Sequence, residues 1–104
     1  MAKPDDQVNE AIRVFVREAG KKYNIVRAYL YGSFSKGTDS EWSDIDLAIV
    51  SPDFTEDLFE DRLNLMRIAA SIDDRIEPHP FNAERFNRND PLADEIQREG
   101  TRIL

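Results

Sequence analysis

The chain has 104 residues, 40% of them hydrophobic and 34% charged, which suits one compact domain spanning residues 1–104 and excludes a large enzyme with a separate substrate domain. Its formal net charge of −7 at pH 7 repels polyanions, so tight non-specific binding of nucleic acid is not expected. Because cysteine is absent and no apolar run approaches the roughly 18 residues of a membrane span, disulfides, thiolate zinc sites and membrane insertion are excluded, and the cytoplasm is the expected location.

An amphipathic helix is predicted over residues 6–21, followed by two strands. The run 25–31 is rich in β-branched and aromatic residues and stops at Gly32, which is typical of a strand that enters a turn. Residues 43–50 alternate in polarity until Pro52 interrupts the pattern, so a second strand is predicted there. The apolar stripe of the helix consists of Val8, Ile12, Phe15, Val16 and Ala19.

The second half of the chain predicts a long helix and then a short strand. Apolar residues recur at helical spacing over residues 55–72, with Thr55 as the expected N-cap and the acidic run 53–61 as the start of the helix and its solvated flank. Residues 75–81 form an extended segment that contains Pro78 and Pro80. Because proline cannot donate a ladder hydrogen bond, only a short strand is expected there.

A final helix is predicted between residues 90 and 100. Asp90 followed by Pro91 is the usual order of an N-cap and a first-turn proline, and Gly100 closes the helix. The predicted order is therefore helix, strand, strand, helix, strand, helix. Three further apolar residues expected to close the core are Phe81, Phe86 and Leu92.

Two carboxylates, Asp44 and Asp46, stand two residues apart in the second predicted strand. Residues at this spacing project from the same face, about 6.5–7 Å apart along the backbone, while Ile45 and Leu47 face the other way. Neighbouring carboxylates repel each other, and a hard cation such as Mg²⁺ removes that repulsion through the oxygen ligands it prefers. The alternative is that Asp44 caps a turn and Asp46 is solvated on an edge strand.

Gly32 and Ser33 directly follow the first predicted strand, with ten residues between Ser33 and Asp44. A glycine at a strand end lets backbone amides approach a phosphate closely, and a helix beginning at Ser33 would add free N–H groups and a hydroxyl. Lys36, one helical turn further on, could add a cation. Each residue also has an ordinary interpretation, with Gly32 in a turn, Ser33 as a helix cap and Lys36 as a solvated lysine.

The segments 31–38 and 43–49 together closely resemble the G-S-x10-D-x-D signature of the DNA polymerase β-like nucleotidyltransferase superfamily, with full agreement in spacing. The resemblance spans nearly the whole chain and is most specific in residues 32–50. The short length is similar to that of minimal nucleotidyltransferases, which often act beside a HEPN-domain partner. The resemblance implies an α/β (α+β) fold in which helices flank a small mixed sheet of three to four strands.

The resemblance also implies roles for individual residues. Gly32 and Ser33 would hold the triphosphate, with Lys36 as a further nucleotide-binding residue. Asp44 and Asp46 would be catalytic and would ligate Mg²⁺.

A third carboxylate on the next strand completes the site in the family, and Glu77 is the candidate for this catalytic and metal-binding role. Because the family usually has aspartate there and Pro78 follows directly, Glu77 could instead face solvent, in which case catalysis fails while nucleotide binding survives. A complete site would use two Mg²⁺ ions and a nucleoside triphosphate, with ATP favoured. His79, the only histidine, is expected to lie in a loop, with contact to the ligand as the less favoured alternative.

Two functions follow from the resemblance. The first is metal-dependent transfer of a nucleoside monophosphate, AMP from ATP, to a hydroxyl of a partner protein. By resemblance the partner is a HEPN toxin with an acceptor tyrosine. This chain would then be the antitoxin of that toxin. The second is a non-catalytic nucleotide-binding module that neutralises its partner by forming a complex. A small-molecule nucleotidyltransferase of the aminoglycoside type ranks last because its helical substrate domain is absent. An exposed sheet edge also permits a homo-oligomer.

Overall fold

The computed structural model describes residues 4–31, 44–55, 57–87 and 89–104. Within them, no helix is both long and apolar enough to cross a membrane. The described helices and strands follow the predicted order, with one short strand added at the end. They are α1 (Pro4–Ala19), β1 (Arg27–Tyr31), β2 (Ile45–Ser51), α3 (Leu58–Ala70), β3 (Ile76–Asn82), α4 (Pro91–Glu99) and β4 (Thr101–Arg102).

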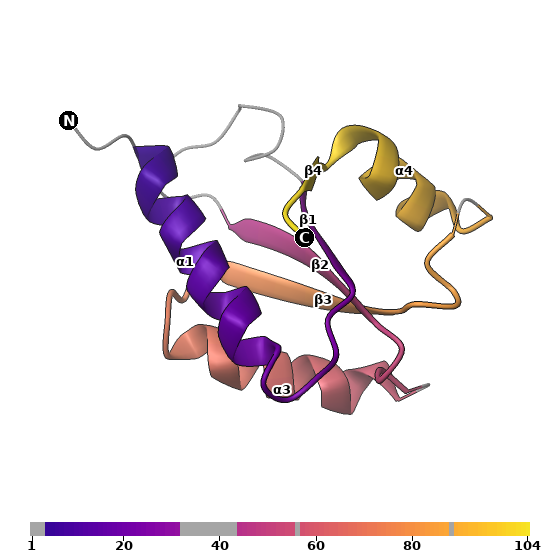
Figure 1. Ribbon diagram of the computed structural model, residues 1–104, viewed down its shortest axis with the longest axis horizontal. Helices are drawn as coiled ribbons and strands as arrows, with labels where there is room; N and C mark the ends of the chain where they lie inside the picture. Colours follow the sequence, from indigo (N-terminus) through magenta and orange to yellow (C-terminus); the bar gives the residue numbers. More distant parts are fainter. Residues whose placement is uncertain (1–3, 32–43, 56, 88) are drawn as a thin grey trace.

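The four strands form one mixed sheet in the order β3-β2-β1-β4 (Figure 1). β2 and β3 are parallel and are connected through α3, while β1 pairs antiparallel with β2 on one side and with β4 on the other. A parallel pair needs a crossover connection, which α3 provides. The expected α/β fold with a small mixed sheet and flanking helices is confirmed.

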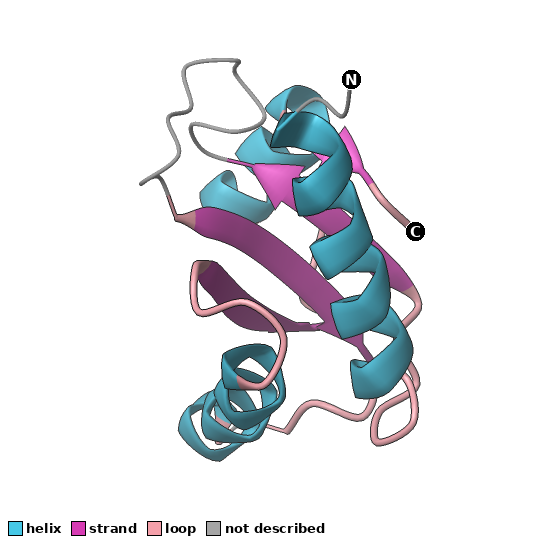
Figure 2. Cartoon of the chain, turned by 90° about the vertical axis from the view of Figure 1, so that its left-hand side faces the viewer, coloured by secondary structure: helices cyan, strands magenta, loops and turns pink. Residues whose placement is uncertain are grey.

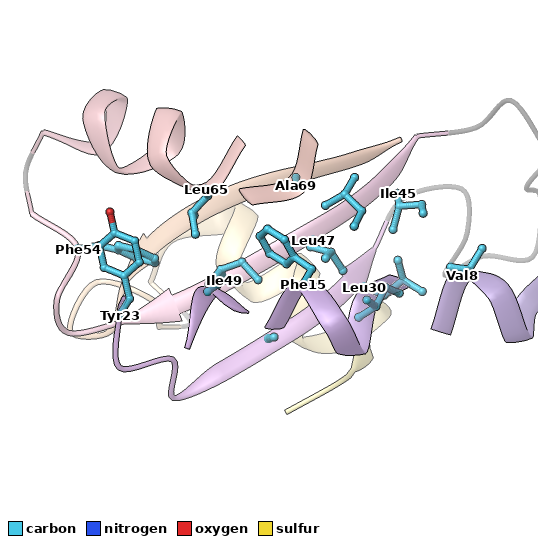
Figure 3. Close-up of a cluster of buried hydrophobic side chains, with 14 residues drawn as sticks. Val8, Phe15, Tyr23, Leu30, Ile45, Leu47, Ile49, Phe54, Leu65 and Ala69 are labelled. Atoms are coloured by element: carbon cyan, nitrogen blue, oxygen red, sulfur yellow. The ribbon is translucent and has the colours of Figure 1, made fainter. Parts of the chain in front are cut away.

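Helices α1 and α3 cover one face of the sheet, and Figure 2 shows α1 running across it. The residues of β2 on this face alternate with those on the other, and Ile45, Leu47 and Ile49 are fully buried. Phe15 of α1 and Leu65 of α3 are also fully buried in this core (Figure 3). The predicted stripe of α1 is therefore confirmed, since its residues form this contact.

Helix α4 covers part of the opposite face. It buries Ala48 and Val50 of β2 together with Phe86, which lies in the turn region after β3. Asp46 lies on the same face of β2 but nearer its start, and its side chain keeps 30% of its surface exposed. Among the described residues α4 does not cover the start of β2, and this part of the face contains the candidate site.

The start of α3 differs from the prediction. The N-cap is Asp57, whose carboxylate accepts a hydrogen bond from the backbone N–H of Glu60, and not Thr55. Thr55 instead donates its backbone N–H to Asp61 Oδ2 at 2.9 Å. Asp61 is buried, so the prediction of a solvated acidic flank is wrong for this residue. Its carboxylate accepts a hydrogen bond from the backbone that leads into the helix, which offsets the cost of burying the acid.

Strand β3 is seven residues long, so the prediction of a short strand is wrong. Successive residues of a strand direct their N–H groups to opposite sides, and Pro78 and Pro80 therefore share one side. Because β3 is at the edge of the sheet, one side requires no ladder donors, and prolines are tolerated there.

The C-terminal region agrees with the prediction in its helix and differs in two details. Asp90 Oδ1 accepts hydrogen bonds from two N–H groups of the first turn of α4, and Gly100 is its C-cap. The short strand β4 was not predicted. Leu92 is 46% exposed, so its expected place in the core is wrong, whereas Phe86 is buried and Phe81 packs against the core on this face.

Candidate active site

A row of three polar side chains crosses the sheet at the start of β2. Tyr31 pairs with Asp46 across β1 and β2, and Asp46 pairs with Glu77 across β2 and β3. Paired residues of neighbouring strands project from the same face, so these side chains point to the same side of the sheet. Sequence positions 15 and 31 residues from Asp46 are brought together by strand register.

His79 joins this row from the next position of β3 on the same face. Its Nε2 lies 3.5 Å from Asp46 Oδ1, and the side chains of His79 and Asp46 are 28% and 30% exposed. One ligand atom from each of Asp46, Glu77 and His79 lies within 4.8 Å of the other two. The expected loop position of His79 is wrong, since the residue belongs to β3.

These three residues fit a divalent cation by the chemistry of their donor atoms. Carboxylate oxygen and imidazole nitrogen bind first-row divalent ions at about 2.0–2.2 Å, so ligand atoms on opposite sides of one ion are about 4–4.4 Å apart. The three ligand atoms lie within 4.8 Å of one another, with 3.5 Å between His79 Nε2 and Asp46 Oδ1, so their spacing is close to this range. Small rotations of side chains that are partly exposed would therefore close the set around one ion.

Arg62 of α3 gives Glu77 a competing partner. Its Nη2 lies 3.8 Å from Glu77 Oε2, and both side chains are more than 40% exposed. A distance of 3.8 Å exceeds that of a hydrogen bond, and an exposed ion pair of this kind contributes about 0–1 kcal/mol. Arg62 Nε is buried and has no hydrogen-bond partner among the described residues. Glu77 is therefore only loosely held and remains available to a cation.

Tyr31, on β1, has a raised pKa. Burial, together with the negative charge of Asp46 and then of Glu77, raises the pKa of Tyr31 to about 12, against an opposing effect of Arg62. The centroid of its ring also lies 5.8 Å from that of His79. Tyr31 thus forms one wall of the site and reports the charge of the neighbouring carboxylates.

We expect Asp46→Asn to lower the pKa of Tyr31, because the substitution removes one of the negative charges that disfavour the tyrosinate. Absorbance titration of the tyrosines measures this change. The variant Tyr31→Phe identifies which of the titration steps belongs to Tyr31. Since the folded pKa of Tyr31 lies above its unfolded value, its contribution to stability is complete below about pH 10 and is lost as the pH rises toward 12. An unchanged titration in Asp46→Asn would contradict the placement of Asp46 beside Tyr31.

The structure brings together two of the residues singled out from the sequence and leaves others apart. Asp46 and Glu77 are register partners and share the ligand cluster. Asp44 immediately precedes β2 and is exposed, and it is not among the three clustered residues. Three predicted nucleotide-binding residues lie outside the described residues: Gly32, Ser33 and Lys36. Their roles remain predictions.

Sequence reasoning missed three residues at this site. His79 was assigned to a loop because prolines flank it, although its spacing of two from Glu77 places both on one face of any strand. Tyr31 was treated as a strand residue without a role. Arg62 belongs to a helical segment whose pattern does not indicate that its guanidinium reaches the edge strand.

Known proteins share the sequence pattern and the fold of this chain. The sequence model of the polymerase beta nucleotidyltransferase family matches residues 15–104. No curated protein matches the chain. A crystal structure of a candidate nucleotidyltransferase from Sulfolobus solfataricus is similar, with a TM-score of 0.54 and 20% identity over all of this chain and 89% of that one. At this identity the structural likeness shows the fold, and the family match covers all strands of the sheet. The chain therefore belongs to the polymerase beta nucleotidyltransferase family.

Proposed function

We propose that the protein transfers AMP from ATP to a hydroxyl of a partner protein, with release of pyrophosphate and the hydroxyl proton and with the help of divalent cations. The observation that carries the proposal is the partly exposed cluster of Asp46, Glu77 and His79 in a nucleotidyltransferase fold. The family match supports nucleotidyl transfer in general. The nucleotide, the acceptor and the metal are the parts that we add.

The side chains of the site divide the work between the cation and the nucleotide. Asp46 and Glu77 would hold a divalent cation, and Asp44, which immediately precedes β2, would contribute to a second. Two bound ions would neutralise the charge of the triphosphate and lower the pKa of the attacking hydroxyl. By the sequence prediction, Gly32 and Ser33 would bind the triphosphate.

An acceptor can reach the site because the side chains of Asp46, Glu77 and His79 are 28–42% exposed. The net charge of −7 also matters, since it disfavours a nucleic-acid acceptor and leaves a protein hydroxyl as the better candidate. The sequence resemblance to minimal nucleotidyltransferases supports a HEPN-domain protein as this partner. In that case the chain acts as an antitoxin by modifying the toxin.

The competing function is a module that binds a nucleotide and neutralises its partner without turnover. The ion pair between Glu77 and Arg62 favours it, because it gives Glu77 a structural role that needs no cation. Two variants distinguish the functions, since Glu77→Gln removes the carboxylate while Arg62→Gln removes the ion pair and retains the carboxylate.

We expect Glu77→Gln to reduce label transfer from α-labelled ATP to the HEPN partner by roughly tenfold or more, because the cation loses one charged ligand. Transfer is measured with the purified proteins, ATP and Mg²⁺, and complex formation is followed by size-exclusion chromatography. Arg62→Gln serves as the matched control and should retain transfer.

Neutralisation of the partner by the wild-type protein without any label transfer would favour the binding module. If Glu77→Gln and Arg62→Gln lose label transfer to the same extent, the site needs Glu77 for its ion pair with Arg62 and not for binding a cation.

A further inference from the structure

We propose that His79 is a direct ligand of the cation held by Asp46 and Glu77, and that this site consequently prefers a first-row transition ion such as cobalt or zinc to magnesium. The inference rests on the proposed function and refines it. One of the two ions would then be a transition ion bound by the protein, while the other would be the Mg²⁺ that accompanies the nucleotide.

The position of His79 in the sheet supports this role. Glu77 and His79 are two residues apart on β3, and their register partners on β2 are Asp46 and Ala48. The side chain opposite His79 is therefore a methyl group, which leaves the imidazole free to lean along the strand toward Asp46. Its Nε2 lies 3.5 Å from Asp46 Oδ1. Nε2 is therefore the ring nitrogen that a cation bound to Asp46 would contact.

The surroundings of the ring limit its freedom without blocking Nε2. The Tyr31 ring lies at a tilt of 58° to the imidazole, with 5.8 Å between centroids, and forms a wall on one side. The side chain remains 28% exposed, so a hydrated ion can enter. A ligand that is oriented by packing before the ion arrives loses less conformational entropy on binding.

The donor set predicts the choice of metal. Mg²⁺ strongly prefers oxygen ligands and retains several waters, whereas imidazole suits iron, nickel, copper and zinc better. A site with two carboxylates and one imidazole therefore binds transition ions more tightly than a site with carboxylates alone. His79 gives this chain a ligand type that would distinguish between cations of the same charge.

The simplest alternative is that Nε2 of His79 only donates a hydrogen bond to Asp46 and so orients that carboxylate. The two arrangements differ in whether nitrogen contacts the metal. They can be separated because His79 is the only histidine of the chain, so any imidazole bound to the metal must be its own.

The test is proton NMR of the untagged protein loaded with Co²⁺ in the absence of nucleotide. Ligation through Nε2 leaves N–H at Nδ1, which should give one strongly shifted, exchangeable resonance that disappears in ²H₂O. Binding of Co²⁺ without such a resonance would overturn the role of His79 while leaving the proposed function intact.

Affinity measurements with two variants complete the test. In His79→Gln, the preference for Co²⁺ over Mg²⁺ should fall by roughly tenfold or more, since the nitrogen ligand is lost while an oxygen donor remains. An unchanged preference overturns the inference. Asp46→Asn should weaken the binding of both Co²⁺ and Mg²⁺. Failure of the wild-type protein to bind any divalent cation would overturn the proposed function as well. If His79→Gln does not fold, the wild-type NMR result decides alone.

Discussion

Asp46→Asn is expected to reduce AMP transfer by roughly 10²- to 10³-fold. A metal ion contributes several kcal/mol to stabilising the charge of the transition state, and about 1.4 kcal/mol corresponds to a factor of ten in rate. Asp46 is central to the ligand cluster, since it is the register partner of Glu77 and its carboxylate lies beside His79. Initial rates of label transfer from α-labelled ATP at saturating Mg²⁺ measure the effect.

The matched control for this prediction is Asp94→Asn. Asp94 lies on α4, where its carboxylate pairs with Arg98 Nε at 3.1 Å, so the same chemical change is made outside the cluster. This variant should retain the wild-type rate. The unfolding transition of Asp46→Asn should be close to that of the wild type, because its side chain is partly exposed. A folded Asp46→Asn protein with full activity would refute the metal site.

Local signals predicted the helices of this fold well. The Asp90-Pro91 pair and Gly100 mark the two ends of α4 because capping depends on side chains next to each other in the sequence. The N-cap of α3 was less predictable, since Thr55 and Asp57 are both good capping residues. The choice of Asp57 depends on Asp61, whose buried carboxylate holds the backbone N–H of Thr55 outside the helix.

The strands show where local reasoning reaches its limit. Pro78 and Pro80 were expected to exclude a central position in the sheet, and β3 does lie at the edge, but whether prolines shorten a strand depends on that position. At the edge they have no such effect. The short strand β4 has no pattern of its own, because two residues are too few to show alternation, and it forms because α4 returns the chain alongside β1.

The site likewise combines features that depend on local sequence with features that depend on strand pairing. Alternation within β2 placed Asp46 on the face opposite to Ile45 and Leu47, which the structure confirms. Which residues of β3 lie beside Asp46 is decided by the register of two strands separated by α3, and no local pattern contains that register. The resemblance suggested Glu77 for this place, whereas the position of His79 beside Asp46 follows only from the register of β2 and β3.

Phe15→Ala is expected to lower the free energy of unfolding by about 3–5 kcal/mol, through lost burial and the cavity that remains. Phe15 is fully buried between α1 and the face of the sheet that carries Ile45, Leu47 and Ile49. Small domains are stable by about 5–15 kcal/mol, so the loss is a large part of the total. Urea unfolding followed by circular dichroism measures it as a lower midpoint with an unchanged slope.

Phe59→Ala is the control, because this side chain is 72% exposed on α3 and its removal should change stability by no more than about 0.5 kcal/mol. Equal losses of unfolding free energy for the two phenylalanine substitutions would contradict the layered core.

At low temperature, where Phe15→Ala remains folded, this variant should still bind divalent cations, since Phe15 and Asp46 lie on opposite faces of the sheet. Asp46→Asn should show the reverse behaviour, with stability retained and cation binding lost. Alternation along β2 is the physical reason that one strand can support the core and the site independently.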